Sequence, residues 1–200
     1  TLTSRIELET NVKNSRGNIV KRLTKTVVLD AKATTAIKQI FTINKPTLWD
    51  INNPYLYTVA TNIRQDGRLL DSYDTPLGIR QIAFKPNDGF WLNDRRVPIK
   101  GVCLHHDNGP LGAAVNIRAI ERKFEIMKAM GANAIRTSHN PPSPEFVALA
   151  DKMGLLLQVE AFDMWKIGKK TIDNGYHQHF DEWHERDLRD MIKQNRNNPP

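Results

Sequence analysis

The sequence has a single cysteine, Cys103, among its 200 residues, and one cysteine excludes an internal disulfide framework. It has no apolar run near the ~18 residues that a membrane-spanning helix needs, so no membrane partner is predicted. It also lacks the composition of a disordered chain, because 40% of its residues are hydrophobic and 26% are charged. It begins Thr1-Leu2-Thr3-Ser4, without Met or a signal-peptide pattern, which leaves the compartment undetermined. What remains is a globular protein of one large domain or two small ones.

The formal net charge of +7 raises the question of a nucleic-acid partner. The densest basic groups are short and interrupted: Lys21-Arg22, Arg95-Arg96 and residues 166–170. Aromatic side chains do not alternate with them, as they do where bases stack on a protein. The charge therefore predicts a solvated basic face, and no nucleic-acid partner is expected.

The first half of the chain has the period of β-strands. Ile6, Leu8, Thr10 and Val12 alternate with polar residues, as in a half-buried strand. Asp66-Gly67, the favoured hairpin turn, separates two further runs. Strands are also predicted over residues 19–29, 36–43, 55–63, 69–73, 90–92 and 97–101. Short strands with turns at these spacings predict a small antiparallel β-sandwich.

The second half changes to the period of helices. Ile117, Ile120, Phe124 and Met127 recur at helical spacing, and Gly131 follows as a C-terminal glycine. Further helices are predicted over residues 144–153 and 180–194, with strands over residues 133–138 and 155–159. This alternation predicts βα units and a parallel sheet. Three such units do not close an eight-stranded barrel, so we expect a larger α/β domain that is truncated after residue 200.

Polar residues collect where the predicted strands of the second half end. In a βα barrel the working residues lie at the C-terminal ends of strands and in the loops that follow. Here the three strand ends carry, in order, His105, His106 and Asp107; Arg136, His139 and Asn140; and Glu160, Asp163 and Trp165. This coincidence predicts a functional site, and a tryptophan beside polar groups suits a sugar ring.

Each member also has a structural interpretation. His105 and His106 could be surface loop residues, and Arg136 with Glu160 could form a structural ion pair. Residues 139–142 could serve only as a stiff turn, and Trp165 only as a packing residue.

Other site chemistries find less support in the sequence. The histidines around residues 105 and 177–184 lack the spacing of a known zinc site, so no metal site is predicted. No Gly-x-Ser-x-Gly nucleophile motif is present.

Residues 133–142 read Asn-Ala-Ile-Arg-Thr-Ser-His-Asn-Pro-Pro, and this stretch resembles the first signature of glycoside hydrolase family 2. Residues 48–49, 53–57 and 78–80 resemble the immunoglobulin-like domain that precedes the barrel in that family. Residues 90–101 resemble its lead-in hairpin and residues 101–107 its first barrel strand. Residues 160–165 and 182–187 resemble segments of its β-galactosidase-like members. The resemblance implies an immunoglobulin-like β-sandwich, residues 1–88, followed by the first three βα units of a truncated TIM barrel, residues 89–200.

The implied activity is retaining hydrolysis of a β-glycoside, β-galactosidase-like, by two glutamates. In the family the acid/base lies in a Trp-Ser-x-Gly-Asn-Glu segment on the fourth strand, and the nucleophile lies at the seventh. Both are expected after Pro200, so the 200-residue chain alone is expected to be inactive. The open alternatives are a β-glucuronidase or β-mannosidase of the same family, or a non-catalytic carbohydrate-binding or interaction protein.

The resemblance also implies roles for residues of this chain. Glu160 and Asn140 are expected to support the site. The residues expected to bind substrate are His105, Asp107, Arg136, His139, Asp163 and Trp165. The metal-binding Glu-x-His of well-known β-galactosidases is absent after Glu160, so no magnesium requirement and no other cofactor is expected. The expected partners are a carbohydrate substrate and the remainder of the same polypeptide, and a homo-oligomer of the full-length enzyme stays open.

Overall fold

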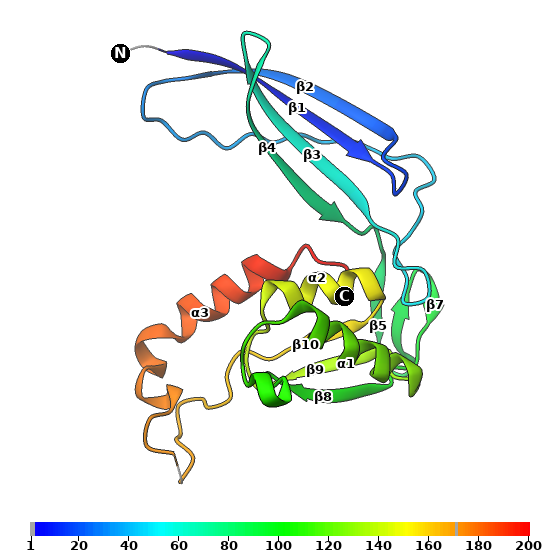
Figure 1. Cartoon of the computed structure of the whole chain (residues 1–200), viewed down its shortest axis with the longest axis vertical. Coiled ribbons are helices and arrows are strands. Elements are labelled where there is room, and N and C mark those ends of the chain that lie inside the picture. Colours follow the sequence, from blue (N-terminus) through cyan, green and yellow to red (C-terminus); the bar gives the residue numbers. More distant parts are fainter. Residues whose placement is uncertain (1–2, 171) are drawn as a thin grey trace. The chain divides into compact units, whose positions relative to one another are not determined.

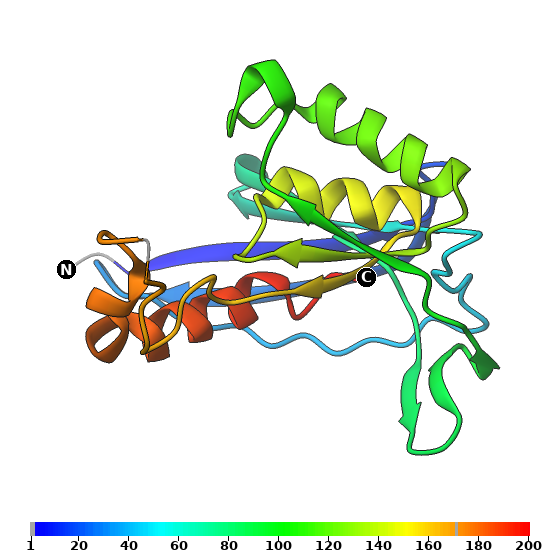
Figure 2. The ribbon, with the colours of Figure 1, turned by 90° about the horizontal axis from the view of Figure 1, so that it is seen from below.

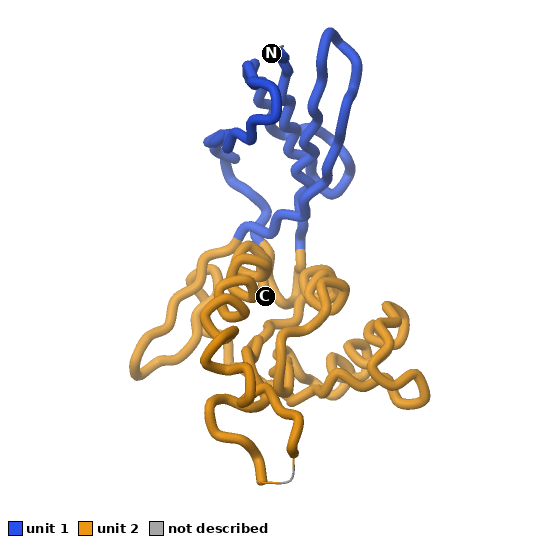
Figure 3. The backbone as a smooth tube through the Cα atoms, turned by 90° about the vertical axis from the view of Figure 1, so that its left-hand side faces the viewer, with its two compact units in different colours: residues 1–48, 55–79 blue, residues 49–54, 80–200 orange. Residues whose placement is uncertain are grey.

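The computed structural model describes residues 3–170 and 172–200. The chain divides into two compact units, coloured separately in Figure 3. The first consists of Thr1–Leu48 and Tyr55–Ile79, and the second of Trp49–Pro54 and Arg80–Pro200. No helix within the described residues is both long and apolar enough to cross a bilayer.

The first unit contains one four-stranded antiparallel sheet (Figure 1). Its strands are β1 (Ser4–Lys13), β2 (Ile19–Leu29), β3 (Tyr57–Gln65) and β4 (Arg68–Leu77), in the order β2-β1-β3-β4. The alternating residues that predicted β1, from Ile6 to Val12, are buried. Asp66 and Gly67 take positive φ angles of 49° and 80°, so the predicted hairpin between β3 and β4 is confirmed.

The strand predicted over residues 36–43 is wrong, because this segment pairs with no neighbouring strand. Its alternation is nevertheless real: Ile37, Gln39, Phe41 and Ile43 are partly buried, and the residues between them are exposed. Gln39 Oε1 accepts a hydrogen bond of 2.7 Å from the Thr10 hydroxyl of β1. Period-2 alternation reports which side of an extended segment packs, and it carries no information on whether a ladder partner is available.

The second unit begins with a short three-stranded antiparallel sheet made of β5 (Ile82–Lys85), β6 (Gly89–Leu92) and β7 (Arg95–Arg96). Asn93 and Asp94 form the predicted turn between β6 and β7, with φ angles of 51° and 61°. The strand predicted over residues 97–101 is wrong. Pairing ends where the Val97 amide donates to the Phe90 carbonyl, since the next residue, Pro98, has no amide to continue it. β5 was not predicted, because all four of its residues are exposed and leave no alternation.

Three parallel βα units follow. The strands are β8 (Gly101–His105), β9 (Ala134–Ser138) and β10 (Leu156–Val159), in the order β10-β9-β8. The helices are α1 (Ile117–Ala129), α2 (Pro144–Met153) and α3 (Phe180–Asn195), and single 3₁₀ turns lie at Gly109–Leu111 and Tyr176–Gln178. β9, β10 and the three helices overlap the segments predicted from their residue patterns, and β8 lies within residues 101–107, which the family resemblance gave as the first barrel strand, so the predicted βα units are confirmed.

Side-chain caps mark the starts of α1 and α2. Asn116 and Ser143 accept hydrogen bonds from the amides three residues further on, at the starts of α1 and α2. Gly154 ends α2 in the left-handed conformation, with φ 70°. In Figure 2, α1 and α2 lie on the same side of the three strands. Between helices and sheet lies a core that includes Phe124, Ile135 and Phe146, and the two phenyl rings meet edge to face with centroids 4.7 Å apart.

Candidate active site

The two faces of the parallel sheet differ in what covers them. Val102, Leu104 and Ile135 pack into the core under α1 and α2. Successive side chains of a strand point to opposite faces. Cys103 and Arg136, which are adjacent in their strands to these core residues, therefore face away from the helices. In a βα barrel this second face is the barrel interior.

The strand register sets the interior residues in rows. Cys103 of β8 lies opposite Arg136 of β9, which lies opposite Gln158 of β10. One row nearer the C-terminal ends, His105 lies opposite Ser138. The parallel pairing therefore brings together side chains that are up to 55 residues apart in the sequence (158 − 103).

Arg136, His139 and Glu160 form one hydrogen-bonded cluster at these strand ends. One Glu160 oxygen accepts from Arg136 Nε, and the other lies 2.6 Å from His139 Nδ1. The Glu160 amide donates to the Thr137 hydroxyl at 3.1 Å, which ties the end of β10 to β9. Both carboxylate oxygens are thus engaged, and Glu160 is placed to hold its neighbours in position.

The hydrogen bonds define the charge states of the cluster. The Arg136 hydrogen bond first, and the His139 hydrogen bond second, lower the pKa of Glu160, so this carboxylate is ionised at neutral pH. Glu160 in turn raises the pKa of Arg136. A contact of 2.6 Å between His139 Nδ1 and a carboxylate requires the proton on Nδ1, which leaves Nε2 to face other partners.

His105 and Cys103 extend the cluster onto β8. The imidazole rings of His105 and His139 meet edge to face, with centroids 5.3 Å apart. Arg136 Nη1 lies 3.3 Å from Cys103 Sγ. Ser138, beside His105, is buried, and its hydroxyl oxygen has no hydrogen-bond partner among the described residues.

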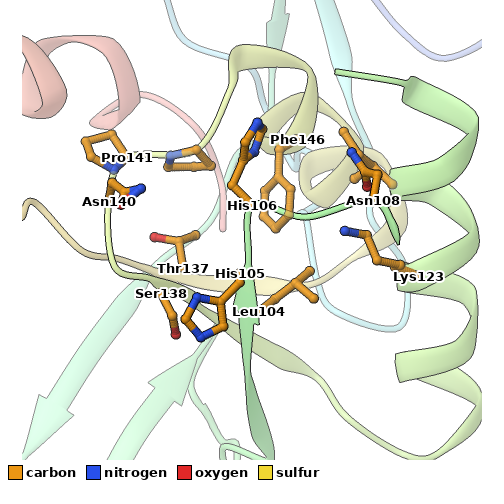
Figure 4. A pocket seen from close by; sticks show the side chains of 12 residues that line it. Leu104, His105, His106, Asn108, Lys123, Thr137, Ser138, Asn140, Pro141 and Phe146 are labelled. Atoms are coloured by element: carbon orange, nitrogen blue, oxygen red, sulfur yellow. The ribbon is translucent and has the colours of Figure 1, made fainter. Parts of the chain in front are cut away.

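A small cavity of about 20 Å³ lies beside the cluster and is shown in Figure 4. The side chains of His105 and His106 leave β8 in opposite directions, and His105 lies next to Ser138 (Figure 4). Leu104 and Phe146 also line the cavity, so it reaches toward the helix side of the sheet. Since a single water needs about 10–15 Å³ by this measure, the cavity is far too small for a sugar.

A larger cavity, of about 480 Å³, opens over the cluster itself. Its lining includes Arg136, His139 and Glu160, together with Trp165 and Lys169 of the loop after β10. Its volume falls within the range of small-molecule sites in proteins. The cavity therefore has both charged and aromatic side chains in its lining.

The loop that carries Trp165 is anchored by an aromatic cluster. The Phe162 ring stacks on Tyr176 with centroids 4.7 Å apart, and it meets Trp165 edge to face at 5.3 Å. Phe180, at the start of α3, lies edge to face with Phe162 at 5.8 Å. Trp165 remains 58% exposed, which leaves indole surface on which a ligand can stack.

Asp163 carries the second carboxylate of this cavity, and it is also paired. Lys169 Nζ lies 2.8 Å and 2.9 Å from its two oxygens. The Lys169 hydrogen bond is the main reason why the pKa of Asp163 is lowered, and the charges of His139 and His105 lower it further. Asp163 therefore lies within electrostatic reach of the histidine pair.

The remaining predicted residues lie at the rim or outside the cavity. One Asp107 oxygen accepts from the Gly109 amide at 2.7 Å, so its carboxylate is used within its own loop. His106 bonds the Ala113 carbonyl at 2.8 Å. Asn140 lines the small cavity next to Pro141. The structure thus brings six of the predicted residues into one site, and these are His105, Arg136, His139, Glu160, Asp163 and Trp165.

The residues of the site do not form a cation-binding set. Both oxygens of Glu160 are taken by Arg136 and His139, and both oxygens of Asp163 face Lys169. Over residues 3–170 and 172–200, no three His, Cys, Asp or Glu side chains are grouped so that they could hold a metal ion. The donors present therefore do not fit a magnesium ion.

This geometry can be compared with that of known protein families. Residues 83–200 match the family domain described as "Glycosyl hydrolases family 2, TIM barrel domain". Residues 1–80 match the one described as "Glycosyl hydrolases family 2". The chain belongs to glycosyl hydrolase family 2. Its parallel sheet is accordingly the start of a TIM barrel, and the expected fold class, an immunoglobulin-like sandwich followed by three βα units, is confirmed.

Individual relatives agree with the family. A protein named beta-galactosidase BoGH2A, from Bacteroides ovatus, is 52% identical over 161 residues, which are 80% of this chain and 19% of that protein. A putative beta-glucuronidase from Formosa agariphila is 40% identical over 157 residues, 78% of this chain and 15% of that protein. The crystal structure of a family 2 member from Bacteroides cellulosilyticus superposes with a TM-score of 0.91 at 42% identity, over 99% of this chain and 25% of that one. The chain thus spans a quarter or less of each of these relatives.

Two residues of the candidate site escaped the sequence analysis. Cys103 lies within a strand, and only the parallel register shows that it shares a row with Arg136. The alternation of β8 could have indicated it, since Cys103 lies between two core residues, Val102 and Leu104. Lys169 lies in an irregular loop without periodicity, and no sequence signal indicated that it meets Asp163.

Proposed function

We propose that this chain forms part of the sugar-binding site of a retaining β-glycoside hydrolase that cleaves β-galactosides. The observation that carries the proposal is the cluster of Arg136, His139 and Glu160 under a cavity with an exposed tryptophan. A sugar needs both features, because its hydroxyl groups require polar partners and its C–H face packs on aromatic rings.

The chemistry divides between this chain and the remainder of the polypeptide. Retaining hydrolysis uses one carboxylate as nucleophile and a second as acid/base, about 5–5.5 Å apart. Glu160 and Asp163, the two carboxylates that line the cavity, are each held by a cation and are poorly suited to either role. We therefore assign the catalytic pair to glutamates in the part of the polypeptide that follows residue 200.

The residues of this chain then bind and orient the substrate. Arg136 places a permanent positive charge at the floor of the cavity, where it can keep neighbouring carboxylates ionised. His139, with its proton held on Nδ1 by Glu160, offers Nε2 to a sugar hydroxyl. His105 supports it from β8, and Trp165 supplies the stacking surface.

The choice of β-galactosides rests on the 52% identical relative named beta-galactosidase BoGH2A. A second candidate is β-glucuronide hydrolysis, which two other likenesses favour. One is the Formosa agariphila protein. The other is a Bacteroides uniformis beta-glucuronidase, whose structure superposes with a TM-score of 0.85 at 33% identity over 98% of this chain and 23% of that one.

The test begins by reading the coding DNA of the source past codon 200, where a Trp-Ser-x-Gly-Asn-Glu segment is expected. The full-length protein is then assayed on 4-nitrophenyl β-galactoside, β-glucuronide and β-mannoside. Hydrolysis with retention, and preference for the galactoside, would support the proposal. A natural stop directly after codon 200, with a stable chain that binds glycans without turnover, would favour the non-catalytic alternative.

A further inference from the structure

Lys169 is the one basic residue of the site cavity that does not belong to the Arg136 cluster. It comes from the loop after β10 and bridges both oxygens of Asp163, at 2.8 Å and 2.9 Å. Both partners are accessible, since the Lys169 side chain is 50% exposed and that of Asp163 is 38% exposed. The pair therefore belongs to the cavity lining and is accessible to a substrate.

The loop holds the two residues at this spacing. Met164, which lies between them, is buried, and the Lys169 amide lies 3.4 Å from its sulfur atom. Phe162, which precedes Asp163, is stacked on Tyr176. The contacts of Met164, which is buried, and of Phe162, which is partly buried, thus hold this loop, although the side chains of Asp163 and Lys169 are accessible.

The charges lining the cavity balance in pairs. Arg136 faces Glu160, and Lys169 faces Asp163. Neither cation is left over to meet an anionic substrate. A uronic acid differs from a neutral hexose by a carboxylate in place of a hydroxymethyl group. Its binding is therefore favoured by an unpaired cation and opposed by the repulsion of each nearby carboxylate.

We propose that the Asp163–Lys169 pair selects uncharged glycosides, because Asp163 neutralises Lys169 and repels the carboxylate of a uronic acid. The inference rests on the proposed hydrolase function and names the substrate class of that same site. Asp163 also keeps lone pairs that can accept from the hydroxyl groups of a neutral hexoside, including the hydroxymethyl group that a uronic acid lacks.

The test is a ratio of specificities in the full-length enzyme. The value of kcat/KM for 4-nitrophenyl β-glucuronide is divided by that for 4-nitrophenyl β-galactoside, in the wild type and in variants. Asp163→Asn removes the repelling charge and frees Lys169, so the ratio should rise about fivefold, the upper size of one partly exposed charge contact. Lys169→Met leaves Asp163 without its counter-ion, so it should leave the ratio unchanged or lower it.

The chain offers a matched control. Asp181, at the start of α3, pairs with Lys166 at 2.9 Å, and both side chains are more than 70% exposed. Neither residue lines the site cavity, so Asp181→Asn should leave the ratio unchanged.

The outcomes separate the two proposals. A wild type that prefers the glucuronide, an Asp163→Asn ratio that rises less than threefold, or an equal rise in Asp181→Asn would each overturn the selection by this pair and leave the hydrolase function standing. A wild type that hydrolyses neither substrate would overturn the proposed function, and the selection falls with it.

Discussion

Asp151 offers a quantitative test of the packing between α2 and its neighbours. This aspartate of α2 is only 2% exposed, and it lies next to Asn198, which is itself partly buried. One of its carboxylate oxygens accepts a hydrogen bond of 2.7 Å from the side-chain amide of Asn198. The other oxygen has no hydrogen-bond partner among the described residues. Its main-chain carbonyl accepts from the indole of Trp49, which is fully buried. The carboxyl group is therefore desolvated and only half satisfied.

Burial raises the pKa of Asp151 from its ordinary value of 3.8 to about 6, and the hydrogen bond from Asn198 and the charge of Arg80 only partly oppose it. Because the folded pKa lies above the unfolded one, the folded state binds the proton more tightly between these two values. The free energy of unfolding is therefore largest below pH 4 and falls as the pH rises to about 6. A difference of about 2 units corresponds to ~3 kcal/mol, or ~10²-fold in the local opening equilibrium.

Asp151→Asn removes the charge and keeps an acceptor for Asn198, so it should stabilise α2 at pH 8 and have little effect at pH 4. Hydrogen exchange of peptides covering Pro144–Met153, in the full-length protein, measures this directly, since variant and wild type at one pH share the same intrinsic rate. Protection should increase by up to ~10²-fold at pH 8. The increase will be smaller by the free-energy cost of the new side-chain amide of Asn, whose N–H donor lacks a hydrogen-bond partner. Glu185→Gln, on the exposed surface of α3, serves as control. Equal protection of Asp151→Asn and wild type at pH 8 would refute the reasoning.

Three further predictions concern the site, the fold and the chain as a whole. Arg136→Ala and His105→Ala in the full-length enzyme should each lower kcat/KM by ~10²-fold or more, because contacts to the transition state are lost, and near-normal kinetics would remove either residue from the site. Gly154→Ala should lower the melting temperature more than Gly131→Ala. Both glycines have positive φ, but only at Gly154 would the new Cβ lie 2.4 Å from a backbone atom, the Ile51 carbonyl oxygen, and equal shifts would contradict this contact. The 200-residue chain alone should release no nitrophenol from aryl β-glycosides, and turnover that survives repurification would show that it has its own catalytic groups.

The parallel half of the fold was predictable because its signals are local. α2 runs from Pro144 to Met153, which is the range predicted from the sequence. The errors fall where structure depends on a partner that the sequence does not name. Residues 36–43 alternate between exposed and partly buried side chains, as predicted, but they pair with no strand. β5 pairs with β6 although all its side chains are exposed.

The site was predictable to the same extent. Residues at strand ends could be grouped because parallel strands end at one edge, and the structure does join Arg136, His139 and Glu160. The state of each carboxylate could not be foreseen. Whether Glu160 is free or saturated depends on distances of a few tenths of an ångström, and the pairing of Asp163 depends on the path of an irregular loop.

The rows of the barrel interior explain why the charge of Arg136 is directed toward the open end. The row beneath it consists of Gly101, Ala134 and Leu156, which offer no side-chain acceptor. The guanidinium group therefore directs its donors sideways, to Cys103, and upward, to Glu160. Glu160 takes the shorter of these bonds and directs its other oxygen to His139, so Arg136 orients the imidazole of His139 through Glu160. An apolar lower row thus directs a strand arginine toward the strand ends, where a substrate would bind.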